Sequence, residues 1–334
     1  MNITLLFLGI IILIWGLLES LWTTIWVDGN SGPFTGRITT WIWKFFRLIS
    51  PPKWHKFLSL AGPVILSSTV LMWVLLIWLG WTLLFFSEPS SLVVKATHSA
   101  ADFTDVLWYI AYTMFTVGNG DFYPEGNLWQ VLSSLVAFTG ISMVTLSITY
   151  VLQVVSAVTD KRAFASEVLG IGKTPEEFVI KQWTGKDFGA MELQLNSLSG
   201  QLNKLNEQHM AFPILHYYHA AREEKSHDIA IAILDDALNI IQFGMEERYH
   251  PSKTILASAK KSIGSFLVTV EQAFIKPAPE TPPATNLDKV RHHGVPVIGQ
   301  KDFNQNLEKQ EDRRKLILGL IRNGSWNANY RFES

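Results

Sequence analysis

Three long apolar stretches dominate the first half of the chain. Ile3–Val27 is interrupted only by Glu19, and Ala61–Phe86 and Leu128–Val158 carry no charge. Since a bilayer crossing needs about 20 apolar residues, each stretch predicts a transmembrane helix. The first has no basic residue before it and no small-residue cleavage site, so we interpret it as a retained anchor helix, residues 1–30, rather than a signal peptide.

Two further segments have helical periodicity without being long enough to cross. Residues 37–56 place apolar side chains on one face and basic ones, such as Lys44, on the other. This pattern predicts an interfacial helix, which either anchors the chain or relays movement to the next helix. Asp102–Phe115 predicts a half-crossing helix, with Asp102 or Thr104 as its N-cap.

The second half of the chain is polar and predominantly helical in pattern. Residues 188–212 repeat apolar positions at spacings of three and four, which fits either a coiled coil between subunits or a bundle helix within one subunit. Residues 276–310 are rich in Pro and polar residues and predict a flexible linker. The predicted fold class is an all-α membrane protein with three transmembrane helices, a re-entrant pore helix and filter, and a helical cytoplasmic domain. Beyond the anchor and the interfacial helix, the predicted domains are a pore module at 61–160, a helical domain at 161–275, the linker, and a helix with a tail at 311–334.

Charge and composition narrow the function classes. The chain has no Cys and a net charge of −1, and its polar half has no basic patch for nucleic acid. We find no nucleophile–base pair, paired carboxylates or phosphate loop, so we do not expect an enzyme or an organic cofactor. Lys and Arg concentrate between the first two apolar stretches and after the third. This distribution predicts an N-terminus outside a cell membrane and a cytoplasmic C-terminal half.

A short Gly-rich string lies between the second and third apolar stretches. Residues 116–121 read Thr-Val-Gly-Asn-Gly-Asp and follow the predicted half-crossing helix. Stacked backbone carbonyls can replace the water shell of a cation, and alternate glycines allow the backbone angles that align them. The predicted ion-binding residues are Thr116, Val117, Gly118, Asn119 and Gly120.

This string and its surroundings resemble the pore loop of potassium channels. The likeness covers roughly residues 60–160, and it includes Trp108, Tyr109 and Thr113 before the filter and Asp121 after it. The resemblance implies that these four residues support the filter. It also implies that Gly140 is a gating hinge, that four chains form one pore, and that K⁺ occupies it. Asp121 is otherwise an ordinary charge at the pore mouth.

Two residues depart from the family pattern. Asn119 replaces the usual filter aromatic, and Phe115 replaces a Thr behind the filter. These differences keep two alternatives open, a non-selective monovalent cation channel and a non-conducting membrane-anchored scaffold with a degenerate pore. No spanning helix carries an Arg/Lys ladder, which argues against voltage sensing. The sequence names no regulatory ligand or partner protein, and the surrounding lipid is the one other partner it implies.

Histidines cluster in the polar half. His209, His216 and His219, with His227 nearby, could bind a transition metal or sense protons near neutral pH. The alternative is a packed helical element whose imidazoles are satisfied by neighbouring groups.

Overall fold

The computed structural model describes residues 1–27, 31–50, 54–273 and 275–326. The chain divides into a membrane unit, Met1–Ile42 with Pro63–Val154, and a C-terminal unit, Trp43–Gly62 with Val155–Ser334. Four stretches lie outside the described residues: 28–30 at the end of the predicted anchor, 51–53 within the predicted interfacial helix, residue 274, and most of the predicted tail, 327–334.

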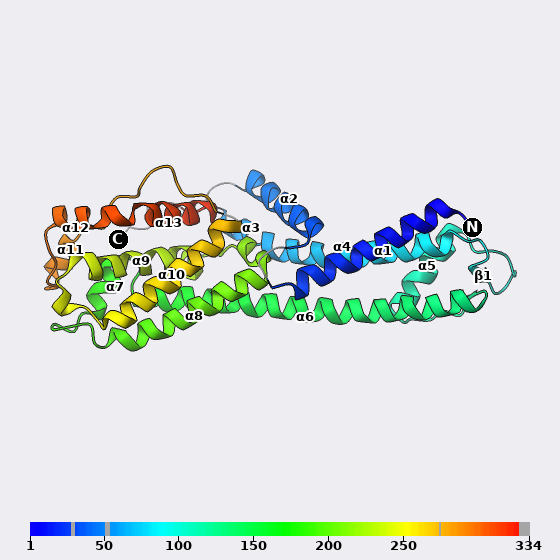
Figure 1. The fold of residues 1–334 in the computed structure, drawn as a ribbon, viewed down its shortest axis with the longest axis horizontal. Helices are drawn as coiled ribbons and strands as arrows, with labels where there is room; N and C mark the ends of the chain where they lie inside the picture. Colours follow the sequence, from blue (N-terminus) through cyan, green and yellow to red (C-terminus); the bar gives the residue numbers. More distant parts are fainter. Residues whose placement is uncertain (28–30, 51–53, 274, 327–334) are drawn as a thin grey trace. The chain divides into compact units, whose positions relative to one another are not determined.

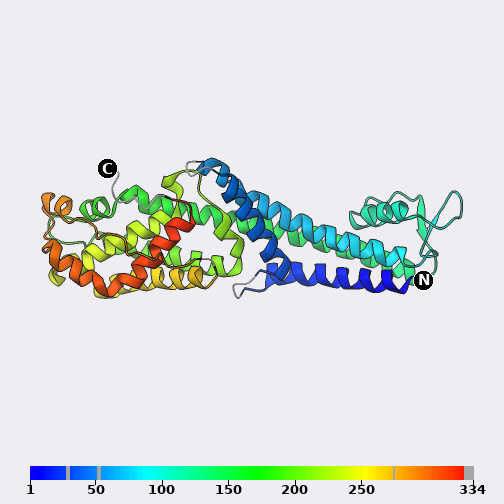
Figure 2. The same ribbon diagram turned by 90° about the horizontal axis from the view of Figure 1, so that it is seen from above.

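The predicted spanning segments are helices long and apolar enough to cross a membrane. They are α1 (Ile3–Ile25), α4 (Ala61–Phe86) and α6 (Asn127–Ile171). α6 continues as one helix past the predicted end at Val158 and into the C-terminal unit (Figure 1). α1 lies along α4 in both ribbon views (Figures 1 and 2), so the predicted anchor is packed within the membrane unit and is not a separate domain.

The turn between α1 and α2 (Pro33–Ile49) is organised by a buried carboxylate. Glu19 is 2% exposed, and its Oε1 accepts a hydrogen bond of 2.6 Å from the backbone N–H of Thr35. A negative charge at a helix N-terminus is favourable because the first N–H groups have no partner inside the helix. The single acidic residue of the first apolar stretch therefore caps α2.

The interfacial helix differs from its prediction at both ends. α2 starts at Pro33 and ends at Ile49, and a separate turn, α3, covers His55–Leu58. Apolar side chains of α2 remain exposed, with Leu48 at 85% and Trp41 at 76%. Such an exposed apolar face is what a helix lying in the membrane interface requires.

The loop between α4 and α6 holds one helix and a small sheet. α5 (Phe103–Met114) is the predicted half-crossing helix, and Asp102 caps it in a reciprocal pair of bonds with Asp105. β1 (Leu92–Val94) and β2 (Phe122–Pro124) pair antiparallel. The sequence analysis missed this sheet, because three-residue strands are too short to show an alternating pattern.

The C-terminal unit is a helical bundle around α9 (His227–Gly244), which is buried along nearly its whole length. Helices on every side cover the apolar residues of α9, as expected for a helix that is hydrophobic all round. The other helices are α7 (Pro175–Gln182), α8 (Met191–Ala211), α10 (Lys253–Ala273), α11 (Asp288–His292), α12 (Gln300–Leu307) and α13 (Glu311–Asn323). Short 3₁₀ turns cover Pro213–Tyr217, Glu223–Lys225, Glu247–Tyr249 and Glu308–Gln310.

Two expectations about this half are resolved by burial. The periodic face of α8 is buried in the core of its own chain, where α8 packs on α10, so this segment is a bundle helix and not a seam between subunits. The flexible linker expected at 276–310 is wrong, because α11 and α12 bury Leu287, Val290 and Phe303 in the same core. Residues 276–310 looked like a linker because their few apolar residues are too widely spaced to form a helical periodic pattern.

A buried ion network ties three helices of the bundle together. Asp235 on α9 is fully buried, and Arg313 of α13 donates to its Oδ1 at 2.6 Å. Lys260 of α10 lies 3.4 Å from the same oxygen. Burial alone would raise the pKa of Asp235, but the two cations outweigh it and lower that pKa to about 2.

Candidate ion-conducting site

The backbone of the loop after α5 alternates between two conformations. Thr116, Gly118 and Gly120 have φ values of 55°, 62° and 79°, whereas Val117 and Asn119 between them are not in the positive region. In an ordinary strand successive carbonyls point to opposite sides. Reversing the sign of φ at every second residue turns them toward a common side. The alternating φ of this loop is therefore compatible with a row of carbonyl oxygens on one side.

This conformation is strained at its first residue. A positive φ is rare for a β-branched residue such as Thr116, whereas Gly118 and Gly120 adopt it without a steric penalty. Strain of this kind costs about 1–3 kcal/mol and persists where the surrounding structure imposes it, most often at functional sites. The strain at Thr116 therefore marks the loop as a candidate functional site.

Hydrogen bonds fix α5 and the start of the loop between the two long helices. The N–H of Val117 donates to the carbonyl of Tyr112 at 2.8 Å. Trp78 of α4 donates from Nε1 to the carbonyl of Leu107 at 2.9 Å. The hydroxyl of Tyr109 lies 2.5 Å from that of Ser133 on α6. Trp78 and Ser133 gave no signal in the sequence, because one Trp or Ser in an apolar stretch is unremarkable.

Gly140 lies where α6 meets the end of α5. A Cβ at Gly140 would collide with the backbone carbonyl of Met114. α6 is continuous through this position. The structure therefore gives Gly140 a packing role against α5, while its predicted role as a hinge stays a prediction.

The predicted filter supports have partners other than an aromatic filter residue. Asn119 donates from Nδ2 to Oδ2 of Asp121 at 2.6 Å. The ring of Trp108 packs edge-to-face on Tyr112 and Phe122, with centroids 6.0 and 5.9 Å apart. Thr113 is half-buried, and its carbonyl accepts from the N–H of Thr116 at 3.1 Å. Asp121 thus bonds to a filter side chain.

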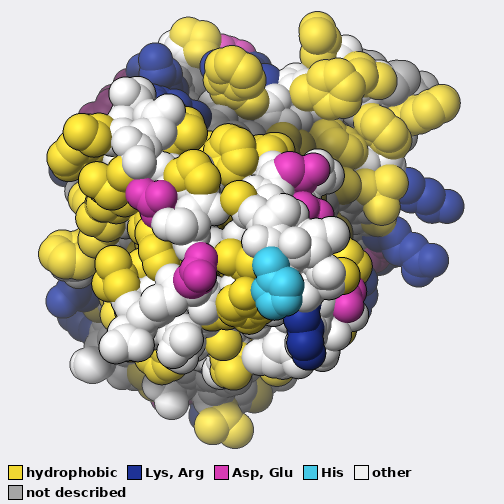
Figure 3. All heavy atoms as spheres, turned by 90° about the vertical axis from the view of Figure 1, so that its right-hand side faces the viewer, with side chains coloured by type: hydrophobic (Ala, Val, Ile, Leu, Met, Phe, Trp, Pro, Cys, Tyr) yellow, Lys and Arg dark blue, Asp and Glu magenta, His cyan; other side chains and the backbone are white. Residues whose placement is uncertain are grey.

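Much of the loop is exposed within a single chain. Val117 is 72% exposed and Phe115 49%. Irregular backbone at membrane depth is tolerated only where protein buries it or where it lines a water-filled cavity. Figure 3 faces the end of the membrane unit that carries β1 and shows acidic side chains among hydrophobic ones; the exposed acids of this loop include Asp102, Asp121 and Glu125. Repeated around a pore, they would raise the local cation concentration.

Polar residues of α6 beyond Gly140 lie on its exposed side. Thr145, Thr149 and Gln153 are exposed, and the two Thr hydroxyls donate to carbonyls of their own helix at 3.0 and 2.9 Å. Exposed polar side chains of a spanning helix face water or another protein chain rather than lipid.

The predicted histidine cluster has separate partners. The Nδ1 of His209 lies 2.9 Å from the carbonyl of Leu205, His216 lies 2.7 Å from the amide of Asn323, and His219 lies 3.0 Å from His55. No group of three or more His, Asp or Glu is arranged to hold a metal ion within the described part of the chain. This corrects the metal-binding interpretation, because the ring nitrogens do not converge on one point.

Comparison with known proteins finds an ion-channel domain in this region of the chain. The sequence model of a family described as an ion channel matches residues 71–157, which include α5, the loop and most of the membrane part of α6. The molecule is therefore a membrane protein with an ion-channel domain.

A full-length relative places it more closely. The chain is 39% identical over 317 residues to the uncharacterized membrane protein YdjJ of Bacillus subtilis (strain 168), which covers 95% of this chain and 93% of the relative. The chain belongs to the same protein family as YdjJ. No solved structure matches it.

Proposed function

We propose that four copies of this chain form a cation channel of the potassium-channel type, with K⁺ preferred over Na⁺. The observation that carries the proposal is the alternating sign of φ at Thr116, Gly118 and Gly120. Carbonyl oxygens aligned on one side supply the neutral ligands that a cation needs when it sheds water. One chain supplies one row of oxygens, and a symmetric ring of such rows surrounds the ion.

The exposed loop supports assembly. An isolated membrane unit would leave Val117 and the neighbouring backbone against lipid, which the bilayer does not tolerate. Packing four loops around an axis removes them from lipid. In this arrangement Thr145, Thr149 and Gln153 line the water-filled cavity below the filter.

The orientation of the proposed channel follows from charge. The segment between α1 and α4 carries Arg37, Lys44 and Arg47, and Arg162 follows the spanning part of α6. Basic residues remain on the cytoplasmic side. The C-terminal unit then lies in the cytoplasm, and the N-terminus and the loop with Asp121 face outside.

One contact favours a second candidate, a non-selective monovalent cation channel. The side chain of Asn119 bonds to Asp121 and supplies no ring to pack against Trp108. A filter without that packing keeps its diameter less rigidly, which weakens discrimination between K⁺ and Na⁺.

The test is ion flux through the purified full-length protein in liposomes, with reversal potentials measured under opposed K⁺ and Na⁺ gradients. Gly118→Ala abolishes flux, because φ is +62° there. Gly126→Ala is the matched control, since Gly126 has φ +85° and equally open surroundings but lies outside the filter. We expect it to retain flux. Wild-type protein without flux in any ionic condition would favour the scaffold alternative.

Asn119→Tyr tests selectivity. We expect the permeability ratio of K⁺ over Na⁺ to rise several-fold, because the ring restores an aromatic contact beside Trp108. An unchanged ratio in a conducting variant would count against the packing argument. A wild-type reversal potential near zero would support the non-selective alternative.

A further inference from the structure

A short segment of the C-terminal unit holds the extension of α6. We call residues 213–219 the strap. Lys161 of α6 is buried, and its ammonium group donates to the strap carbonyls of Leu215 at 3.0 Å and Tyr218 at 3.1 Å. A buried ammonium is expensive to leave unpaired, so these bonds fix the strap to α6.

The strap also holds the segment that leads into α4. We call residues 43–50 and 54–62 of this segment the connector. The rings of Trp43 and Tyr217 lie 5.8 Å apart. Gly62 packs so closely that a Cβ there would lie 2.7 Å from the ring of Tyr218. The connector and α6 are therefore fastened to the same seven residues.

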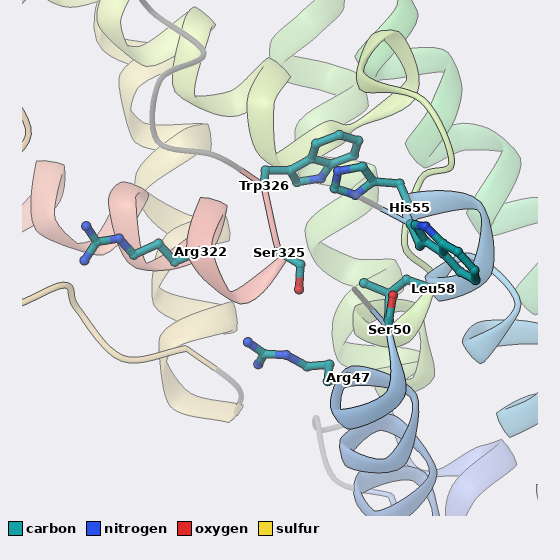
Figure 4. Close-up of a pocket in the computed structure, with 8 residues that line it drawn as sticks. Arg47, Ser50, His55, Leu58, Arg322, Ser325 and Trp326 are labelled. Atoms are coloured by element: carbon teal, nitrogen blue, oxygen red, sulfur yellow. The ribbon is translucent and has the colours of Figure 1, made fainter. Parts of the chain in front are cut away.

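An imidazole pair closes this contact. The Nδ1 of His55 on the connector lies 3.0 Å from the Nε2 of His219 on the strap. Trp326 stacks on His55 with centroids 4.1 Å apart (Figure 4). The ring of Trp326 also lies over His219, with centroids 5.0 Å apart. Such a hydrogen bond needs one N–H donor and one bare nitrogen. When both rings are protonated, both nitrogens are donors and the bond is lost.

We propose that the His55–His219 pair is a proton-binding site that regulates the pore, and that acidification on the side of the C-terminal unit releases the connector from the strap. This inference rests on the proposed channel function. The connector continues directly into α4, and Lys161 binds the strap to α6, the helix that carries Gly140. The strap therefore links the two pore helices of one chain. Protonation of the His55–His219 pair breaks the connector side of this link. Release removes one restraint on α6, and we expect flux to increase.

Charges around the pair disfavour a proton on it while it is docked. Lys161 of α6 and His216 of the strap line a cavity of about 10 Å³, the size of one water, together with His219 and with Asp228 of α9. Arg47 of α2 and Arg322 of α13 line a larger cavity beside His55. Arg322 is paired with Glu280, so Lys161 and Arg47, opposed by the carboxylate of Asp228, leave an excess of positive charge near the pair.

The pKa values of His219 and Asp228 also favour loss of the contact on acidification. Burial lowers the pKa of His219 to about 3, with further contributions from His55 and Lys161. Burial raises the pKa of Asp228 to about 6, so acidification removes the carboxylate charge that opposes Lys161. A released histidine regains an ordinary pKa of about 6.5. The docked contact is thus fully stable above pH 6.5 and weakens as pH falls below it.

The difference in the pKa of His219 between the docked and released forms sets the expected change in the ratio of these forms. At pH 5.5 a released His219 with a pKa of about 6.5 is protonated about 10:1, whereas the docked ring stays neutral. Linkage then shifts the ratio of released to docked protein about ten-fold between pH 7.5 and pH 5.5. Release of His55 as well increases the shift.

The experiment uses the full-length protein in liposomes, with flux measured at pH 7.5 and 5.5 on the side of the C-terminal unit. We expect wild-type flux to rise up to ten-fold at pH 5.5. His219→Gln, which bonds but does not titrate, reduces this rise, and the double variant His55→Gln/His219→Gln loses it. His293→Gln is the matched control, because His293 is exposed in the same unit, and it keeps the rise. A response that is absent in wild type, falls with acid, or persists in the double variant overturns the proposal.

A second readout does not need conduction. Hydrogen–deuterium exchange at the imidazole C2 position, followed by mass spectrometry, reports the protonation and accessibility of each histidine. Exchange of a free imidazole itself slows in acid, so each rate is divided by that of the exposed His293 at the same pH. We expect this ratio to be low for His219 and His55 at pH 7.5 and to rise at pH 5.5. Absent flux with this exchange pattern would reject the channel and leave the proton-sensitive contact standing. Flux with His219 protected at both pH values would reject the contact alone.

Discussion

Substituting Gly140 by Ala separates a packing role from a hinge role. The added Cβ would collide with the carbonyl oxygen of Met114 and would lie 2.7 Å from its Cα, whereas ordinary contact begins at 3.4 Å, so the end of α5 has to move by more than about 0.7 Å. The neighbour is backbone and cannot rotate away. Overpacking of this kind costs about 1–3 kcal/mol, and the better helix propensity of Ala returns at most about 1 kcal/mol.

Gly170→Ala is the matched control for this substitution. Gly170 lies on the same helix, and a Cβ there would meet nothing within 4 Å. We expect this variant to be more stable than wild type by about 0.5–1 kcal/mol, because Ala loses less backbone entropy in a helix. The gain in helix propensity is common to both changes, so the two variants should differ in stability by the overpacking cost, about 1–3 kcal/mol.

The assay is unfolding of the detergent-purified protein, combined with flux in liposomes. We expect Gly140→Ala to unfold earlier than Gly170→Ala and to reduce flux, because α5 positions the loop at Thr116. If Gly140→Ala were as stable as Gly170→Ala and changed only the opening of the pore, the packing argument would fail and the hinge would be favoured.

Three further substitutions test other contacts. Glu19→Gln should destabilise the protein by about 1–2 kcal/mol in thermal unfolding, because a neutral amide replaces the carboxylate that caps α2 at Thr35. Asp235→Asn should cost about 3–5 kcal/mol in denaturant unfolding, since Arg313 loses its buried counter-charge. The wild-type stability from Asp235, present above pH 3.8 and lost as pH falls through about 2, should vanish in that variant. Tyr109→Phe should cost about 1 kcal/mol and reduce flux if its hydroxyl bond holds α5 in place.

The membrane half shows how far pattern alone reaches. Long apolar stretches identified α1, α4 and α6, because a bilayer core admits few other solutions. The Asp102 cap of α5 followed from local chemistry. The Gly-rich string identified the loop residues themselves. Its alternating backbone could be anticipated from the glycines but not the strain at Thr116, which a β-branched residue accepts only under the constraint of its neighbours.

The polar half shows where pattern stops. Periodicity predicted the segment 188–212, where α8 lies, yet its apolar face fitted a subunit contact as well as a core, and burial decided it. The stretch over 276–310 looked like a linker because few of its residues are apolar. It is ordered because Leu287 and Phe303 occupy sites that other helices create.

The sequence by itself determined the three apolar helices, the short capped helix and the Gly-rich loop, because each depends on residues that are close together along the chain. Only the tertiary structure decided which distant groups meet: Glu19 with the start of α2, Gly140 with the end of α5, and His55 with His219. Such contacts join residues that are 16, 26 and 164 positions apart. No local pattern encodes them, since packing is a property of the whole folded chain.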